Sequence, residues 1–371
     1  MSRIKILHAA DLHLDSPFEA LPAGKAAVRR AEQRELLRSL AELSRSEQAD
    51  LVLLSGDLLD SGNTYSETGD ELVRCLGSIA APVFIAPGNH DFYTARSPYA
   101  RLSLPDNVHV FSSPKIECVH MPELSADIYG AAFTENRSAP LLTGFSAERH
   151  EGILNIMCIH GDPSNTDSPY NPISEDELKD SGIDYVALGH IHKASGLKKA
   201  GSTWYSWPGC PEGRGFDETG EKTVSIIELG DGVCTLRPVS IATRRYEILN
   251  VDISGSDPLL AIHRMLPDDT VRDIYRIILR GQTDETPDLK TLYERFAGMF
   301  FELQLRDETR LYRSVWEKAG EDSLRGIFLQ KLLDRLGRAE TDEERSRIEQ
   351  AARWGLAALD NSEEVVSHED Q

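Results

Sequence analysis

The chain has 371 residues, a formal net charge of −21 and 40% hydrophobic residues. This length predicts two or three domains, and no apolar run is long enough to span a membrane. The negative charge argues against a protein that binds nucleic acid through a uniformly basic surface, although bound dications, a local basic groove or a partner would each change that balance. The apolar run at residues 4–9 is interpreted as a first strand, because a signal peptide needs a longer apolar core.

The five cysteines are widely spaced and none belongs to a Cys-x-x-Cys pair. We therefore expect no zinc knuckle or redox motif, and interpret the cysteines as small buried apolar residues. Free cysteines of this kind favour a reducing, cytoplasmic location. The five are Cys75, Cys118, Cys158, Cys210 and Cys234.

Residues 1–245 are predicted to form an α/β layered domain. Apolar runs of strand length alternate with stretches that have helical periodicity. The predicted strands are 4–9, 50–55, 83–86, 128–133, 153–159, 184–188 and 203–207, and the predicted helices are 25–47, 66–79 and 174–181. Two further strands, 222–229 and 234–240, are joined by the hairpin turn signal Gly230-Asp231-Gly232.

The rest of the chain is predicted to contain three further parts. Residues 246–314 alternate between strand and helix patterns and indicate a small α+β cap domain. Residues 315–360 carry two amphipathic helices, a hairpin that either packs on its own domain or docks a partner. Within it, Thr341 to Glu344 has the pattern of a capping box. The acidic tail 361–371 is expected to be disordered.

Five short clusters of metal-binding residues follow predicted strands of the first domain. Because loops at the carboxyl ends of strands in an α/β sheet gather at one edge, we expect the clusters to converge. They are Asp11-Leu12-His13, Gly56-Asp57, Gly88-Asn89-His90-Asp91, His160-Gly161-Asp162 and Gly189-His190-Ile191-His192. Each cluster alone is weak evidence, but five in this arrangement predict a metal centre.

The donor types indicate the chemistry. Asp11 and His13 can point at one metal, and the two oxygens of Asp57 can bridge two cations. Asn89 supplies an amide oxygen, and further imidazoles complete a set without thiolate. Such a set suits manganese or iron(II), with zinc as an alternative, and two adjacent dications are suited to phosphoryl transfer by metal-activated water.

His90 is predicted to be a catalytic residue. It neighbours Asn89 and need not bind a metal, so it can protonate the leaving oxygen or hold the scissile phosphate. Asp60 is predicted to orient His90 through a carboxylate–imidazole hydrogen bond. Asp91 is interpreted as a turn residue or a support for the ligands.

At these clusters the sequence resembles the calcineurin-like metallophosphoesterases, and in particular their DNA-repair nuclease branch of SbcD-type and YhaO-like exonucleases. The resemblance extends over nearly the whole chain and includes the later segments 208–214 and 218–222. SbcD sequences usually have Gly where this chain has Asp15, which favours the YhaO-like group. The phosphate-gripping arginine of protein Ser/Thr phosphatases is absent from the stretch Asp60-Ser61-Gly62, which disfavours that activity.

The resemblance implies a four-layer metallophosphoesterase β-sandwich flanked by helices. It also implies two metals, most readily Mn²⁺, with one held by Asp11, His13, Asp57 and His192. The second metal would be held by Asp57, Asn89, His160 and His190. His90 would be the catalytic histidine, supported by Asp60.

The implied activity is manganese-dependent DNA cleavage, as a 3′-to-5′ exonuclease with some endonuclease activity. The implied partners are DNA and a coiled-coil ATPase of the SbcC or YhaN type, and a homodimer fits the resemblance. Two alternatives remain open, a phosphodiesterase for small nucleotides and a mainly structural subunit. Candidate DNA contacts lie near the clusters and are Tyr93, Arg96, Arg101, Lys193 and Arg214.

Overall fold

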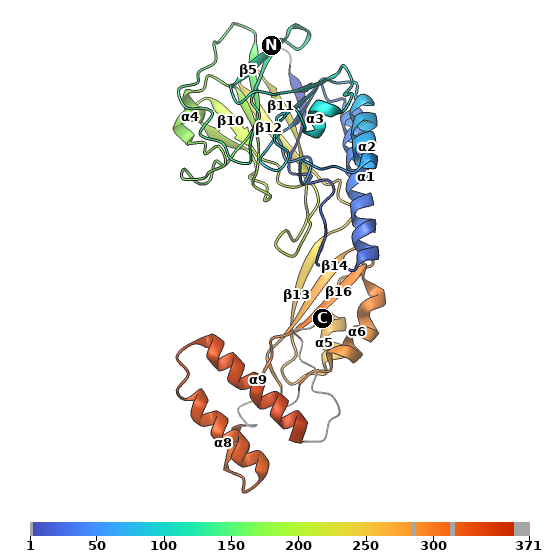
Figure 1. The fold of residues 1–371 in the computed structure, drawn as a ribbon, viewed down its shortest axis with the longest axis vertical. Helices are drawn as coiled ribbons and strands as arrows, with labels where there is room; N and C mark the ends of the chain where they lie inside the picture. Colours follow the sequence, from blue (N-terminus) through green and yellow to red (C-terminus); the bar gives the residue numbers. More distant parts are fainter. Residues whose placement is uncertain (1–2, 284–285, 312–315, 360–371) are drawn as a thin grey trace. The chain divides into compact units, whose positions relative to one another are not determined.

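A computed structural model describes residues 3–283, 286–311 and 316–359, and the predicted tail 361–371 lies outside these ranges. The chain divides into two compact units, Met1–Tyr246 and Glu247–Gln371 (Figure 1). Each unit has its own hydrophobic core. No helix within the described ranges combines the length and apolar content needed to cross a membrane.

The first unit contains two six-stranded sheets. The first sheet has the order β12-β11-β1-β2-β3-β4, in which β1 to β4 are parallel and β11 and β12 form an antiparallel hairpin at one end. Its strands are β1 (Ile4–Ala9), β2 (Leu51–Leu54), β3 (Val83–Ile85), β4 (Val108–Val110), β11 (Val224–Gly230) and β12 (Val233–Val239).

The second sheet has the order β5-β6-β7-β8-β10-β9, with four parallel strands between antiparallel edges. Its strands are β5 (Glu117–Met121), β6 (Ala126–Gly130), β7 (Leu154–His160), β8 (Tyr185–Gly189), β9 (Lys198–Ala200) and β10 (Thr203–Ser206). The helices of this unit are α1 (Ala23–Glu47), α2 (Ser66–Gly77), α3 (Pro98–Arg101), α4 (Glu175–Asp180) and the 3-10 turn η1 (Pro122–Leu124).

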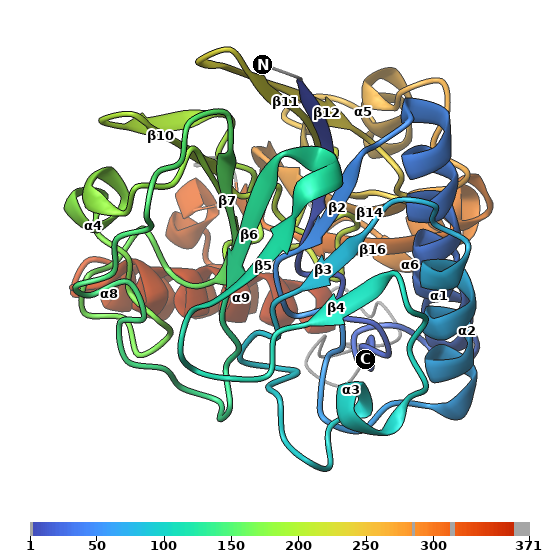
Figure 2. The same ribbon diagram turned by 90° about the horizontal axis from the view of Figure 1, so that it is seen from above.

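Three buried clusters hold the layers together. Alternate residues of β1, such as Ile6, pack with Ile128 of the second sheet and form the core between the sheets. The intervening residues, such as Leu7, pack with Leu40 of α1 and with α2. The far face of the second sheet buries Leu178 of α4. Figure 2 shows α1 and α2 on one side of β2 and β3, with β6 and β7 on the other side. The predicted layered α/β sandwich is confirmed.

The second unit is a small α+β module with two helices after it. Its three-stranded sheet has the order β13-β14-β16, with β14 and β16 parallel, and a two-stranded sheet joins β15 to β17. Its elements are β13 (Tyr246–Asp252), α5 (Pro258–Met265), β14 (Ile274–Arg280), β15 (Gln282–Thr283), α6 (Leu289–Phe296), η2 (Ala297–Met299), β16 (Glu302–Asp307), β17 (Arg310–Leu311), η3 (Lys318–Gly320), α8 (Leu324–Leu336) and α9 (Asp342–Leu359).

The last two helices begin at side-chain caps. Ser323 Oγ accepts a hydrogen bond from the Gly326 amide at the start of α8. Thr341 Oγ accepts from the Glu344 amide at the start of α9, as the capping pattern predicts, while the Glu344 carboxylate accepts from the Glu340 amide rather than from that of Thr341. The pair buries Leu329 and Ala352 in a small core of its own.

Candidate metal centre

The five clusters come from both sheets of the first unit. Asp11 follows β1, Asp57 follows β2 and Asn89 follows β3, all in the first sheet. His160 ends β7, and His190 directly follows β8, both in the second sheet. The structure brings all seven sequence-predicted ligands together where the carboxyl ends of these strands meet.

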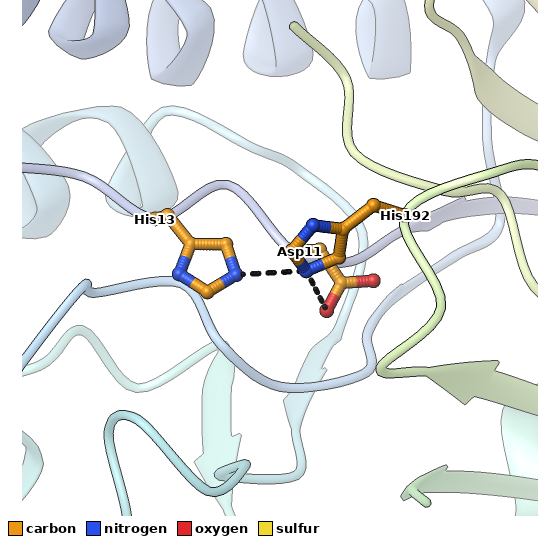
Figure 3. A group of neighbouring side chains, drawn as sticks. All are labelled: Asp11, His13 and His192. Carbon is orange, nitrogen blue, oxygen red and sulfur yellow. Dashed lines mark hydrogen bonds and ion pairs between the residues drawn. The ribbon is translucent and has the colours of Figure 1, made fainter. Parts of the chain in front are cut away.

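One group of donors consists of Asp11, His13 and His192, whose ligand atoms all lie within 4.8 Å of one another. His13 Nε2 is 3.2 Å from His192 Nε2, and His192 Nε2 is 4.0 Å from Asp11 Oδ1. Figure 3 shows the two imidazoles turned edge to edge, with the carboxylate beside His192. Asp11 and His13 are fully buried, so these donors face one another instead of bulk water.

A second group consists of Asp57, His160 and His190. His160 Nε2 is 3.4 Å from Asp57 Oδ2, and Asn89 Oδ1 lies 3.0 Å from His160 Nε2 and 3.2 Å from His190 Nδ1. The same Asp57 oxygen is 3.8 Å from His13 Nε2 in the first group. Asp57 therefore stands between the two groups, where its carboxylate can contact two cations.

The hydrogen bonds of three imidazoles favour a cation at this centre. His13 Nδ1 donates to the Asp60 carboxylate at 3.1 Å, and His192 Nδ1 donates to Glu218 at 2.6 Å. His160 Nδ1 donates to the main-chain oxygen of Ser55 at 2.8 Å. With Nδ1 used in this way, each Nε2 faces the carboxylates or Asn89, and Nε2 presents a lone pair there once it is deprotonated. Such converging acceptors repel one another unless positive charge lies between them, so the residues fit divalent metals.

The pKa values of the metal-free protein show the same need for positive charge. Burial disfavours the charged form of Asp57, but His160 and His13 outweigh burial and hold its pKa well below the usual range. Burial lowers the pKa of His160, yet the charge of Asp57 raises it to about 9. Burial raises the pKa of Asp11 to about 6. A proton on His160 thus balances Asp57 in the absence of metal, and a bound cation would take that position.

Four of the predicted metal ligands have a backbone in the left-handed region. The φ angles are 55° at Asp11, 45° at His13, 51° at Asp57 and 104° at His190. This region is sparsely populated for residues other than glycine and costs about 1–3 kcal/mol each. The layered core around the loops must impose these conformations, which turn the donor atoms inward.

Two glycines allow the loops to approach closely. Gly56 has a φ of +88°, and a Cβ there would lie 2.4 Å from His160 Nδ1. A Cβ at Gly88 would lie 2.3 Å from Asp57 Oδ1. Since neither approach leaves room for a side chain, the Gly-Asp and Gly-Asn pairs in the sequence reflect packing around the ligands.

Asp91 ties the ligand loops together. Its buried carboxylate accepts hydrogen bonds from the amides of Gly88 at 2.7 Å and Leu58 at 2.7 Å, and from the Tyr99 hydroxyl at 2.5 Å. It also accepts from the amides of Asp57 and Leu59, each at 3.2 Å. Asp91 therefore supports the loops of the predicted ligands, since its oxygens are occupied by backbone amides and by the Tyr99 hydroxyl.

Asp60 does not orient His90 as predicted. His90 Nδ1 donates to the main-chain oxygen of Asp60 at 3.1 Å, whereas the Asp60 carboxylate contacts His13, Ser16 and Arg214. The predicted carboxylate–imidazole hydrogen bond to His90 is wrong, because the loop after Asp57 turns the Asp60 side chain toward His13. His90 is exposed, and its ring centre lies 4.7 Å from that of His13.

Glu218 and Arg214 form a support that sequence reasoning missed. Glu218 accepts from His192 Nδ1, from the Arg214 amide at 2.8 Å and from Arg214 Nη2 at 2.9 Å. Arg214 Nη1 is also 3.2 Å from the Asp60 carboxylate, so one guanidinium joins the carboxylates behind two ligand imidazoles. No spacing signal links Glu218 to His192, since the contact depends on how a distant loop folds back.

That loop is anchored to α1 by a buried ion pair. Arg29 is fully buried and lies 2.8 Å from the Glu212 carboxylate, while its Nη2 donates to the Gly213 main-chain oxygen at 3.1 Å. Arg29 also contacts Glu32, which bonds to Arg244. These contacts hold the segment that carries Arg214 and Glu218 against the layer of helices.

The candidate DNA contacts differ in their exposure to solvent and in whether they already bind other side chains. Arg96, Arg101 and Lys193 are exposed, whereas Tyr93 is partly buried against two cores of the unit. Arg214 is engaged by Glu218 and Asp60, as described above. A cavity of about 250 Å³ lies beside Asp60 and Arg214. It is also lined by Ser16, Pro17, Phe18, Glu19, Ala20, Leu21 and Tyr246.

Residues 4–194 match the model of the family described as calcineurin-like phosphoesterase. The chain belongs to this family. It is 30% identical over 284 residues to the uncharacterized metallophosphoesterase YhaO of Bacillus subtilis, covering 72% of this chain and 68% of that protein. The family binds divalent metals and acts on phosphoesters, so this chain is a phosphoester hydrolase whose His and Asp groups can hold metal.

Two further relatives of this phosphoesterase have names that refer to a nuclease or to DNA. The SbcD component of the nuclease SbcCD from Bacillus subtilis is 23% identical over 271 residues, which cover 62% of this chain and 67% of that protein. The DNA double-strand break repair protein Mre11 of Methanopyrus kandleri is 22% identical over 225 residues, which cover 56% of this chain and 49% of that protein.

Proposed function

We propose that this phosphoesterase is a dinuclear-metal, manganese-dependent DNA nuclease that acts as a 3′-to-5′ exonuclease with endonuclease activity in DNA repair. The observation that carries the proposal is the pair of donor groups that meet at Asp57. Their carboxylate, amide and imidazole donors suit manganese. The names of the SbcCD and Mre11 relatives support DNA as the substrate.

In this proposal the side chains act mainly by position. Two bound dications would supply the positive charge that stabilises a phosphate in the transition state and acidifies water. Asp60 and Glu218 fix the rings of His13 and His192 through their Nδ1 atoms. His90 donates its Nδ1 proton to a main-chain oxygen, so its Nε2 is available to a substrate. A protonated His90 can then deliver its Nε2 proton to the leaving oxygen.

We further propose that the helical pair α8 and α9 docks a coiled-coil ATPase of the SbcC or YhaN type. Leu324 and Ile327 of α8 are exposed at 70% and 54% and lie one helical turn apart. An apolar face at this spacing can pack on a partner helix. The homodimer and the cytoplasmic location that the sequence analysis predicts for this chain remain predictions.

A phosphodiesterase for small nucleotides is the second candidate. The cavity of about 250 Å³ beside Asp60 and Arg214 favours it, because a nucleoside could enter there while its phosphate reaches the metal centre. A mainly structural subunit, the third alternative, is less well supported, because an adaptor has no use for converging buried ligands.

The test uses end-labelled duplex DNA and bis-p-nitrophenyl phosphate, each with manganese. Shortening of the duplex by the wild type, lost in Asp57→Asn and retained in the exposed control Asp106→Asn, would support the nuclease and reveal its polarity. Hydrolysis of the small diester with intact DNA would favour the small-nucleotide enzyme, unless the added ATPase partner restores DNA cleavage.

A further inference from the structure

A second group of metal-binding side chains lies on the edge of the second sheet. Cys118 and His120 belong to the edge strand β5, and Asp127 lies on its neighbour β6. One ligand atom from each of the three falls within 4.8 Å of the others, and His120 Nδ1 is 2.8 Å from Asp127 Oδ1. In contrast to the phosphoesterase centre, this group contains a thiol.

The strand pairing places the three side chains on one face. Val119 and Met121 of β5 pack toward the core between the sheets, so the alternating residues Cys118 and His120 point away from it. His120 pairs with Asp127, and Cys118 pairs with Tyr129, which packs in the cluster on that outer face. The convergence thus follows from the register of the hairpin.

The neighbouring strand β7 carries a side-chain oxygen that accepts no hydrogen bond from the described residues. Asp127 pairs in parallel register with Asn155 of β7, which is 1% exposed. Asn155 Oδ1 is buried and has no hydrogen-bond partner in the described part of the chain, while its Nδ2 donates to main-chain oxygens of Glu148 and Gly182. The oxygens of Asp127 and Asn155 are neighbouring acceptors in one row, and such a row favours a cation on this face.

We propose that Cys118, His120 and Asp127 bind a zinc-class ion at a second, mononuclear site. Thiolate, imidazole and carboxylate are the donors that zinc takes in tetrahedral sites, and the exposure of Cys118 and His120 leaves a fourth position for water. On binding, the Cys118 thiol releases its proton to solvent and the sulfur forms the bond to the metal.

The second site is separate from the phosphoesterase centre. Asn155 lies near the start of β7 and His160 lies at its end, about 17 Å apart at the usual rise of a strand. The ion would cross-link β5 to β6, and β5 is the edge strand of this sheet among the described residues. Edge strands expose unpaired backbone groups and are prone to fraying, so the ion would stabilise this hairpin.

Cobalt provides a test, since a cobalt–thiolate bond gives a charge-transfer band in the near ultraviolet. The protein is stripped by a chelator and titrated with Co²⁺. We expect the wild type and Asp57→Asn to develop the band with one equivalent bound at the second site, and Zn²⁺ to bleach it. Cys118→Ser should lack the band and retain one equivalent less zinc after dialysis, with unchanged hydrolysis of bis-p-nitrophenyl phosphate.

Cys210→Ser is the matched control, because the buried Cys210 lies next to His192, with Sγ 3.5 Å from the His192 main-chain oxygen. This variant should keep the band. A band that survives in Cys118→Ser and disappears in Cys210→Ser would assign the thiolate to the phosphoesterase centre and overturn the proposal, as would the absence of any band in the wild type. If Cys118→Ser fails to fold, as judged by circular dichroism, His120→Asn serves instead and should weaken the band.

Discussion

The carboxylates behind His13 and His192 fix which imidazole nitrogen faces the metal centre. Asp60 and Glu218 each accept from an Nδ1 atom, and Arg214 holds both carboxylates in place. A ring held in this way presents Nε2 in a fixed direction, which raises its basicity as a ligand.

Replacing Glu218 with Gln should therefore weaken the metal centre. The amide can bond to His192 without its negative charge, and it loses part of the pairing with Arg214. We expect metal affinity or manganese-dependent hydrolysis to fall by about 10–100-fold. Metal titration followed by calorimetry measures this, and the exposed Glu221→Gln variant should behave as the wild type. Equal behaviour of both variants would mean that Glu218 has no role in holding His192.

His90→Ala should separate chemistry from metal binding. The ring of His90 is exposed, and its Nδ1 is fixed by a main-chain oxygen. Loss of a positioned acid typically lowers the rate by about 10²–10⁴-fold, while the two donor groups remain complete. Elemental analysis should find the metal content of the variant close to that of the wild type. Loss of metal together with activity would identify His90 as a ligand.

The sequence pattern indicated the predicted ligands but not the residues that support them. Asp11, Asp57 and His190 stand in short clusters after strands, so their pattern is visible in the sequence. Glu218 has no such signature, because its contact with His192 depends on a loop anchored by Arg29 and Glu212. The atom of Asp60 that meets His90 likewise depends on a turn that no spacing specifies.

At the scale of elements, the strands with a continuous apolar run were the easiest to predict. β1 has the predicted bounds, and β2, β3, β7 and β8 differ by one or two residues. β6 begins earlier than predicted and ends at Gly130. The prediction did not include β5, because its exposed face carries Cys118 and His120 and its apolar signal is weak.

The loops that follow β2 and β3 are joined through Asp91, and this predicts a large local effect. Asp91→Ala would leave the amides of Gly88 and Leu58 without their buried acceptor. We expect a loss of about 3 kcal/mol, since hydrogen bonds to a charged group are worth about 1.5–3 kcal/mol each. Tyr99→Phe removes a single hydrogen bond and should cost less.

Denaturant unfolding of the metal-free protein compares these two variants with the wild type. Amide hydrogen exchange at residues 57–59 provides a local readout and should be faster in Asp91→Ala. If Asp91→Ala were no less stable than Tyr99→Phe, the Asp91 carboxylate would not be the main support of these loops.

At the scale of the whole molecule, the two units have separate cores, so their stabilities should respond differently to metal. All the predicted metal ligands belong to Met1–Tyr246. Saturation of one site at 100 times its Kd stabilises the folded state by about 2.7 kcal/mol. Calorimetry should therefore show one transition that rises with manganese and falls with chelator, and another that does not move. A common shift of both transitions would mean that the units unfold together.

Asp11 and Asp57 have left-handed backbones, and this conformation decides which substitution gives an inactive protein that still binds its substrate. Alanine at these positions removes the ligand oxygens but keeps a strained φ that it tolerates poorly, so lost binding could reflect a misfolded loop. Asparagine accepts this conformation more readily than most residues and keeps the shape of the side chain without its charge. Asp57→Asn is thus the better substrate trap for co-crystallisation, because the site would stay assembled around a bond that it cannot cut.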